Sequence, residues 1–129
     1  MNETSRTNHD DIAHDRWLSF LDTFSRQHQD WLVTIEIFGP DGRRTEVEER
    51  HLKGISIDHA GDKERAYVQT GGTPEEHVTH VVNSPIRMNL KQLPSGAHQG
   101  LEITSADGTT TSISFRTAML PEMLDGMAA

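Results

Sequence analysis

The sequence predicts a single α+β domain in which an N-terminal helix packs on a strongly curved antiparallel sheet, or small open β-barrel, of about seven strands. Apolar residues recur with helical spacing near the N-terminus, and from residue 31 onward they alternate with polar residues as in half-buried strands. Turn signals separate the alternating runs at hairpin spacing. A flat sheet with the helix across it is the alternative. We expect residues 1–10 to be a disordered polar end, residues 11–126 to be the domain, and residues 127–129 to be a tail.

The helix is predicted over residues 11–28, with Asp10 or Asp11 as its N-cap. His28 lies at its C-terminal end, where the helix dipole favours a protonated imidazole. One face carries apolar residues at positions i, i+3, i+4 and i+7, which is typical of a helix docked on a sheet. These residues are Trp17, Phe20, Leu21 and Phe24.

The clearest strand is Trp31–Phe38, which a Gly39–Gly42 turn follows. The next segment, Thr45–Leu52, carries so many charges that it suits an edge strand. Shorter alternating runs predict further strands, and a last helical turn closes the domain. They cover residues 55–57, 65–70, 77–82, 86–90, 101–104 and 111–115, with a hairpin at Asp107-Gly108 and the helical turn at 121–126.

Residues 73–82 fit two structures. Thr73, Pro74 and Glu76 form a helix start, whereas the following residues are β-branched and end before Pro85. Because too few residues remain for a stable helix, we expect a strand at 77–82.

The composition excludes several classes of function. Twenty acidic and 12 basic residues give a net charge of -8, which argues against general nucleic-acid binding. No apolar stretch approaches the roughly 20 residues of a membrane span, and the N-terminus lacks the apolar segment of a secretory signal. The absence of cysteine excludes disulfides and thiolate metal sites and fits the reducing cytoplasm.

The segment from Trp17 to Thr34 resembles the start of a family of small, mostly bacterial proteins known only as a domain of unknown function. The shared pattern is a W-x-x-F-x-x-x-F-S-R-x-H helix, then W-L-V-T, then an all-β remainder. His77-Val78-Thr79-His80 and the late hairpin that leads to Phe115-Arg116 also resemble that family. The resemblance covers about residues 12–126. It implies a cytoplasmic, single-domain bacterial protein and no activity, cofactor or catalytic residue.

Eight histidines are the most conspicuous chemical feature. On a helix, His77 and His80 would share one face and suit a metal, but on a strand they point to opposite faces. A third ligand would have to come from Asp58, His59 or His51. We therefore expect no metal site and no cofactor, with His80 half-buried and hydrogen-bonded. No nucleophile elbow, phosphate-binding loop or zinc-protease motif is present, so no catalytic residue is assigned.

These observations predict a non-enzymatic cytoplasmic module that binds a protein or a small ligand. We also expect a homodimer, because the segment around Ile86 to Leu93 has few charges for a sheet edge, with Met88 or Leu90 near the contact.

Two alternatives remain at this point. One is a small hydrolase or isomerase in the barrel mouth, with His80, His77 and Asp58 as acid/base or metal groups. The other is a small-ligand carrier. A deep pocket that unites His80, Arg87 and a carboxylate would favour the enzyme, whereas a shallow apolar surface would favour the interaction module.

Overall fold

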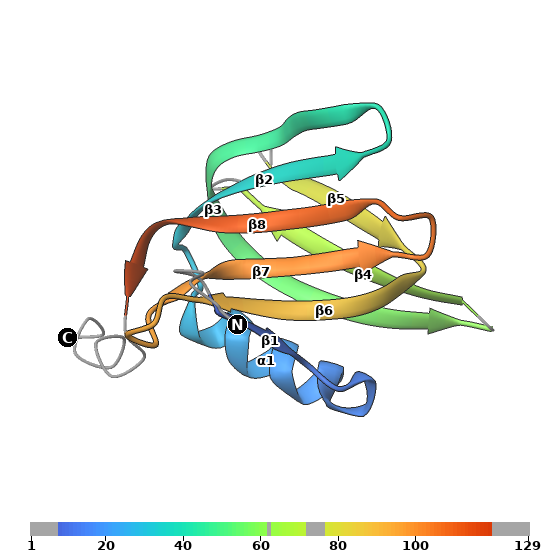
Figure 1. Ribbon diagram of the computed structural model, residues 1–129, viewed down its shortest axis with the longest axis horizontal. Helices are drawn as coiled ribbons and strands as arrows, with labels where there is room; N and C mark the ends of the chain where they lie inside the picture. Colours follow the sequence, from blue (N-terminus) through green and yellow to red (C-terminus); the bar gives the residue numbers. More distant parts are fainter. Residues whose placement is uncertain (1–7, 62, 72–76, 120–129) are drawn as a thin grey trace, which may run out of the picture.

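A computed structural model describes residues 8–61, 63–71 and 77–119 (Figure 1). Within these residues the chain forms eight strands, one α-helix and one short 3-10 helix. In chain order they are β1 (Asn8–Asp11), η1 (His14–Arg16), α1 (Trp17–Gln27), β2 (Leu32–Gly39), β3 (Gly42–Ala60), β4 (Lys63–Thr70), β5 (Val78–Asn83), β6 (Pro85–Gln92), β7 (His98–Ser105) and β8 (Thr110–Met119). The predicted α+β class is confirmed, and the predicted helical turn at 121–126 lies outside the described residues.

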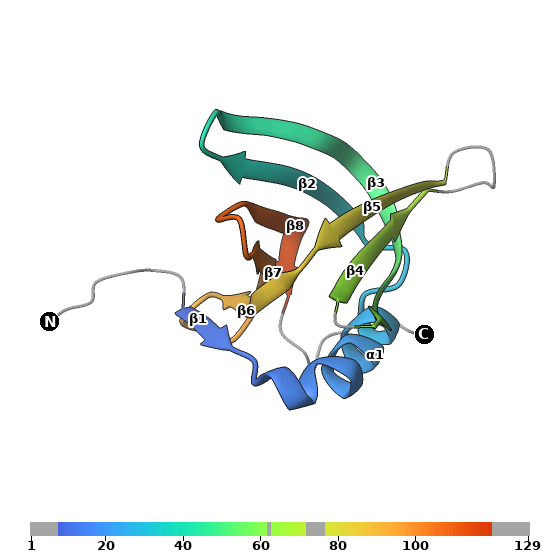
Figure 2. The ribbon, with the colours of Figure 1, turned by 90° about the vertical axis from the view of Figure 1, so that its right-hand side faces the viewer.

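All strands belong to one antiparallel sheet with the order β1-β6-β7-β8-β2-β3-β4-β5. The sheet is strongly curved, but its two end strands do not pair with each other in the described part of the chain, so the barrel is not closed (Figure 2). The curvature is concentrated in β3, a strand of 19 residues. Its first part pairs with β2 and its second part, from Leu52, pairs with β4.

Three register shifts interrupt the pairing of β3. Two lie in its pairing with β2, on either side of Ile35, and the third lies between Leu52 and Gly54 in its pairing with β4. Glu49, at one of the shifts opposite β2, has a positive φ of 49°. The two short strands predicted at 45–52 and 55–57 are therefore one continuous, bent strand.

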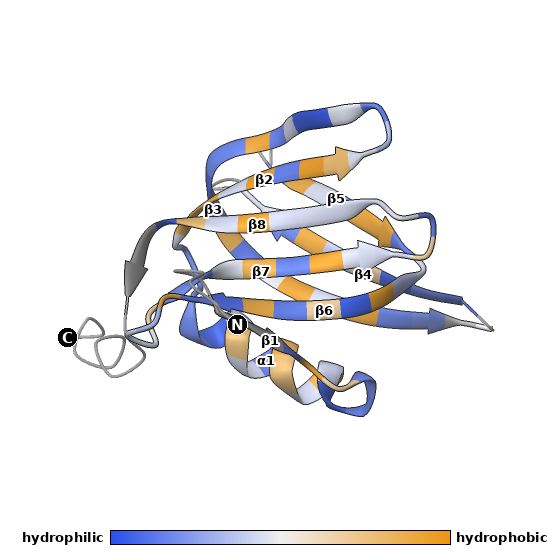
Figure 3. Cartoon of the chain, in the orientation of Figure 1, coloured by the Kyte–Doolittle hydropathy of each residue, from blue (hydrophilic) through white to orange (hydrophobic). Residues whose placement is uncertain are grey.

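The core lies on the concave face of the sheet. Hydrophobic and hydrophilic residues alternate along β2, β6 and β7, as Figure 3 shows. On β2, for example, Val33, Ile35 and Ile37 are buried. Directly paired residues of antiparallel strands share a face, so the buried rows continue from strand to strand.

Helix α1 covers one end of the curved sheet, away from the β2–β3 hairpin (Figure 2). Trp17, Leu21 and Phe24 are buried, and Phe20 packs against the same core, which confirms the predicted stripe. Ser25 fixes the helix to β3: its hydroxyl donates to the Ile55 carbonyl at 3.1 Å and accepts from the Ile55 N–H at 2.9 Å.

The start of the chain differs from the prediction. The helix begins at Trp17, its N-cap is Arg16, and no side chain caps it, so the assignment of Asp10 or Asp11 as N-cap is wrong. Residues 8–11 instead form β1, which pairs with β6 and thereby satisfies main-chain groups of both strands. The Trp17 indole N–H donates to the Ile12 carbonyl at 2.9 Å and holds the turn between β1 and the helix.

The prediction of a charged His28 at the helix end is also wrong. His28 is 0% exposed; its Nδ1–H donates to the Phe24 carbonyl at 2.7 Å, and its Nε2 accepts from His98 Nδ1–H at 3.1 Å. The rings of Trp31 and Phe115 pack on the imidazole. Burial lowers the pKa of His28 to about 4 and also lowers the pKa of His98. The cost of burying a charge exceeds the attraction of the helix dipole, so the pair is neutral.

The edges of the sheet also differ from the prediction. β6 lies between β1 and β7, so the predicted sheet edge at 86–93 is wrong. Met88 and Leu90 are 0% and 8% exposed and therefore offer little side-chain surface to a second copy. The pairing with β1 covers this strand, which the sequence alone does not indicate. The charged segment at 45–52 has an inner position in the sheet order, although its first part pairs with β2 alone among the described strands.

Candidate ligand-binding cleft

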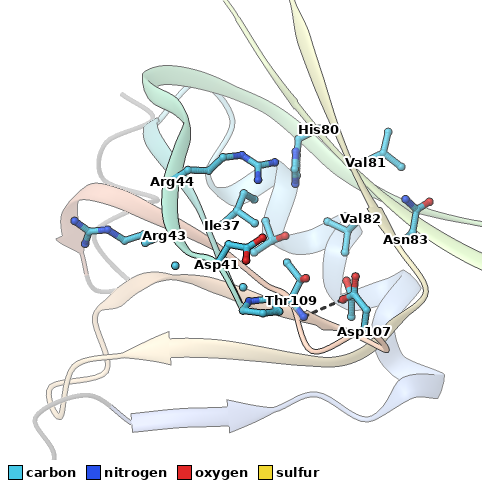
Figure 4. Close-up of a pocket in the computed structure, with 15 residues that line it drawn as sticks. Ile37, Asp41, Arg43, Arg44, His80, Val81, Val82, Asn83, Asp107 and Thr109 are labelled. Atoms are coloured by element: carbon cyan, nitrogen blue, oxygen red, sulfur yellow. Dashed lines mark hydrogen bonds between the residues drawn. The ribbon is translucent and has the colours of Figure 1, made fainter.

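A cleft of about 440 Å³ opens between β5, the β2–β3 hairpin and the β7–β8 hairpin (Figure 4). Its floor is the concave face of the sheet, where Ile37, Val82 and Thr111 lie. Its rim is polar and includes Arg43, Arg44, His80, Asn83, Asp41 and Asp107. Strand β5 therefore contributes one wall of the cleft, in agreement with the predicted strand at 77–82.

Strand pairing explains why these side chains face the cleft. Ile37 pairs with both Arg44 and Thr111, so all three lie on the concave side of the sheet. His80 pairs with the buried Val68, which places His80 on the same side. Figure 4 shows the Arg44 guanidinium directed toward the His80 ring.

One side of the cleft holds a charged pair beside a neutral imidazole. Arg44 Nε lies 3.1 Å from Glu46 Oε1. Partial burial lowers the pKa of His80; the Glu46 carboxylate opposes this shift and the Arg44 guanidinium adds to it. A neutral imidazole offers one hydrogen-bond donor and one acceptor, and the guanidinium offers only donors.

The opposite side of the cleft is acidic. The Asp107 carboxylate accepts a hydrogen bond from the Thr109 N–H at 2.9 Å, and bonding to Thr109 lowers the pKa of Asp107. Asp41 adds a second carboxyl group from the β2–β3 turn. The rim thus presents both signs of charge around an apolar floor, which suits a ligand with polar groups at its edges and apolar groups beneath.

The structure brings only one of the three candidate catalytic residues to this cleft. His80 lines it, whereas His77 precedes β5 on the exposed surface. Asp58 is exposed and pairs with Arg65, a position on the convex face and so on the other side of the sheet from His80. Arg87 is also elsewhere, with its Nε 3.9 Å from Asp11.

Sequence reasoning missed the residues that accompany His80. The signal for Arg44 was its place in an adjacent basic pair after the Gly39–Gly42 turn. Which of the two arginines faces inward depends on the register between β2 and β3. A shift by one residue exchanges the faces.

A family model described as "Family of unknown function (DUF5335)" matches residues 8–123. The chain belongs to the DUF5335 family. This confirms the resemblance to a domain of unknown function, and the match includes every described strand and helix. No curated protein and no solved structure matches this DUF5335 chain. Neither described helix has the length and hydrophobicity needed to cross a bilayer.

A second groove, of about 560 Å³, lies between β1, α1 and β6 of the DUF5335 fold. Ile12, Phe20 and Leu90 give it an apolar base, and Asp11 and Arg16 stand at its rim. It is remote from His80 and offers an internal comparison for experiments on the cleft.

We expect the purified DUF5335 protein to hold no stoichiometric transition metal. Among the residues that the structure describes, no group of three or more histidine, aspartate or glutamate side chains is arranged to hold a metal ion. Elemental analysis by mass spectrometry measures the content directly. A value near one metal per chain that is lost in His77→Ala or His80→Ala would contradict the expectation.

Proposed function

We propose that this DUF5335 protein is a non-enzymatic binding module whose ligand occupies the cleft beside β5. The observation that carries the proposal is the cleft itself: about 440 Å³, an apolar floor and a polar rim. This volume falls in the range of roughly 300–1,000 Å³ that is common for ligand sites.

A catalytic role has less support. A general acid or base must lie within hydrogen-bond reach of the proton that it transfers to or from the substrate. His77 and Asp58 do not reach the cleft beside His80, and the nearby carboxylate of Glu46 already pairs with Arg44. The hydrolase or isomerase therefore remains only an alternative.

A carrier for a small ligand is the other alternative. Carriers of this kind enclose their ligand within a barrel. Here Pro40, Asp41 and Arg43 at the rim are exposed, and the sheet is not closed. The open side favours a ligand that extends beyond the cleft.

Location and assembly are part of the proposal. A cytoplasmic location fits the absence of cysteine, and a bacterial source is what the family resemblance implies. A homodimer remains our expectation, through a surface other than Met88 and Leu90. Sedimentation equilibrium at micromolar concentration tests it, and a 14.5 kDa species throughout would contradict it.

We expect small polar fragments to bind in the cleft. In a fragment screen read by amide chemical shifts, the shifts should cluster at Arg44, His80 and Thr109 and spare the second groove around Phe20. Arg44→Ala should weaken the fragments that bind, whereas Arg87→Ala, outside the cleft, should not. Shifts confined to the second groove, or no binding at all, would contradict the proposed function.

A further inference from the structure

We infer that the ligand of the cleft is an extended, uncharged polypeptide segment of a partner protein, which adds to the free edge of β5 as a further strand. The inference rests on the proposed function for the location of the site. It adds the chemical class of the ligand and the way in which it is held.

β5 is the last strand in the sheet order, and β4 is its only partner strand in the described part of the chain. Its other edge lies along the cleft, which four consecutive residues of β5, from His80 to Asn83, help to line. An edge strand presents unpaired main-chain donors and acceptors to whatever lies beside it. The cleft therefore offers a ligand main-chain hydrogen bonds as well as side chains.

The alternation of an antiparallel ladder shows which residues offer these groups. Ser84 N–H donates to the Glu64 carbonyl at 3.0 Å, toward the β4 side. Every second residue of such a strand faces the same neighbour, and no register shift interrupts the pairing of β5 with β4. His80 and Val82 therefore bond to β4, whereas the main-chain groups of Val81 and Asn83 face the cleft.

β5 also lacks the features that protect sheet edges from pairing. Its sequence, V-T-H-V-V-N, contains no proline and no Asp, Glu, Lys or Arg. The opposite end strand, β1, has four residues within the described part of the chain. The part of β3 from Arg43 to Glu49, which has β2 as its only neighbouring strand among those described, reads R-R-T-E-V-E-E. Charged residues and short length protect sheet edges from pairing with other strands. β5 has neither protection, which indicates that its free edge beside the cleft is a binding edge.

The space beside β5 fits one strand better than a second copy of the protein. The β2–β3 hairpin, with Pro40 and Arg44, forms the facing wall of the cleft (Figure 4). A second copy that paired through its own β5 would bring its β4 along, about 4.8 Å further out. A cleft of about 440 Å³ has room for part of a single strand but not for a second sheet.

The side chains of β5 indicate which segment fits. Val81 is 40% exposed on the convex face, where an apolar side chain of the added strand can pack on it. On the concave side, alternate residues of the segment would lie over Ile37 and Val82. The β5 residues carry no formal charge, so an uncharged segment with apolar side chains at both faces is the expected ligand.

The test uses a phage-displayed library of linear eight-residue peptides, selected on the purified full-length chain, with the tightest peptide then synthesised. We expect amide hydrogen exchange at Val81 and Asn83 to slow when this peptide binds. Val81→Pro should weaken binding by about tenfold or more, because proline lacks the N–H that faces the cleft. Val81→Thr keeps that N–H and a β-branched side chain and loses only part of the apolar contact, so this matched control should weaken binding far less than Val81→Pro does.

The outcomes separate this inference from the proposed function. Equal binding to Val81→Pro and the natural chain, or exchange that does not slow at Val81 and Asn83, would overturn strand addition. Fragments that bind the cleft while no peptide is selected would overturn the inference and leave the proposed function in place. A dimer that protects the Val81 amide without peptide would identify a second copy as the occupant and also overturn it. If Val81→Pro fails to fold, the exchange measurement on the natural chain decides alone.

Discussion

Replacing Phe24 with alanine is expected to lower the free energy of unfolding by about 3–5 kcal/mol, the usual cost of removing a large aromatic side chain from a core. Phe24 is 1% exposed. Its ring stacks on Phe20 and Phe115 and contacts the ring of His28. The substitution thus leaves a cavity where the helix, β8 and the histidine pair meet.

Urea denaturation at neutral pH measures the effect. Leu18→Ala is the matched control, because Leu18 belongs to the same helix but is 64% exposed; its expected change is within about 0.5 kcal/mol. A Phe24→Ala variant that lost less than about 1 kcal/mol would show that the helix does not anchor the core as described.

Acid is expected to destabilise the fold through the buried histidine pair. The folded chain keeps His28 neutral down to a pKa of about 4, whereas the unfolded chain protonates it near the ordinary value of 6.5. Between these two pH values the unfolded state binds more protons than the folded state. The free energy of unfolding is therefore highest above pH 6.5 and decreases as the pH falls to about 4. The contribution of His28 is about 3 kcal/mol, and the lowered pKa of His98 acts in the same direction.

Denaturation midpoints measured between about pH 7 and pH 4 test this expectation. The stability of the His28→Asn variant, whatever its value at neutral pH, should decrease much less between about pH 7 and pH 4, because an amide does not titrate. His77→Gln removes a surface histidine and should keep the decline. If the denaturation midpoints of His28→Asn and of the natural chain depended on pH in the same way, His28 would be excluded as the cause of the acid sensitivity.

The helix and most strands could be predicted because their signals are local. The stripe from Trp17 to Phe24 repeats every three or four residues, and β2 alternates at every second residue. Each pattern follows from the element's own geometry and needs no knowledge of distant residues. The Asp107-Gly108 hairpin is similar, since Gly108 adopts a φ of 92° that favours glycine.

Features that depend on distant pairing could not be predicted. β1 has no apolar alternation, and it exists because Asn8 to Asp11 meet β6 much later in the chain. The same holds for His28, whose partner His98 arrives on β7. The cleft is a further case, because Arg44 and His80 meet only when the hairpin and β5 are set around one opening.

The place of β8 in the sheet has a consequence for synthesis. β8 is the last described strand in the chain, yet it lies between β7 and β2 near the middle of the sheet. While a ribosome is still making the protein, β2 therefore lacks a neighbour that lies 82 residues later in the chain, since Val33 pairs with Phe115. Until then the future core has exposed apolar rows and open strand edges. A nascent chain of this topology completes the sheet only after β8 has emerged from the ribosome, and its exposed apolar rows make it prone to aggregation until then.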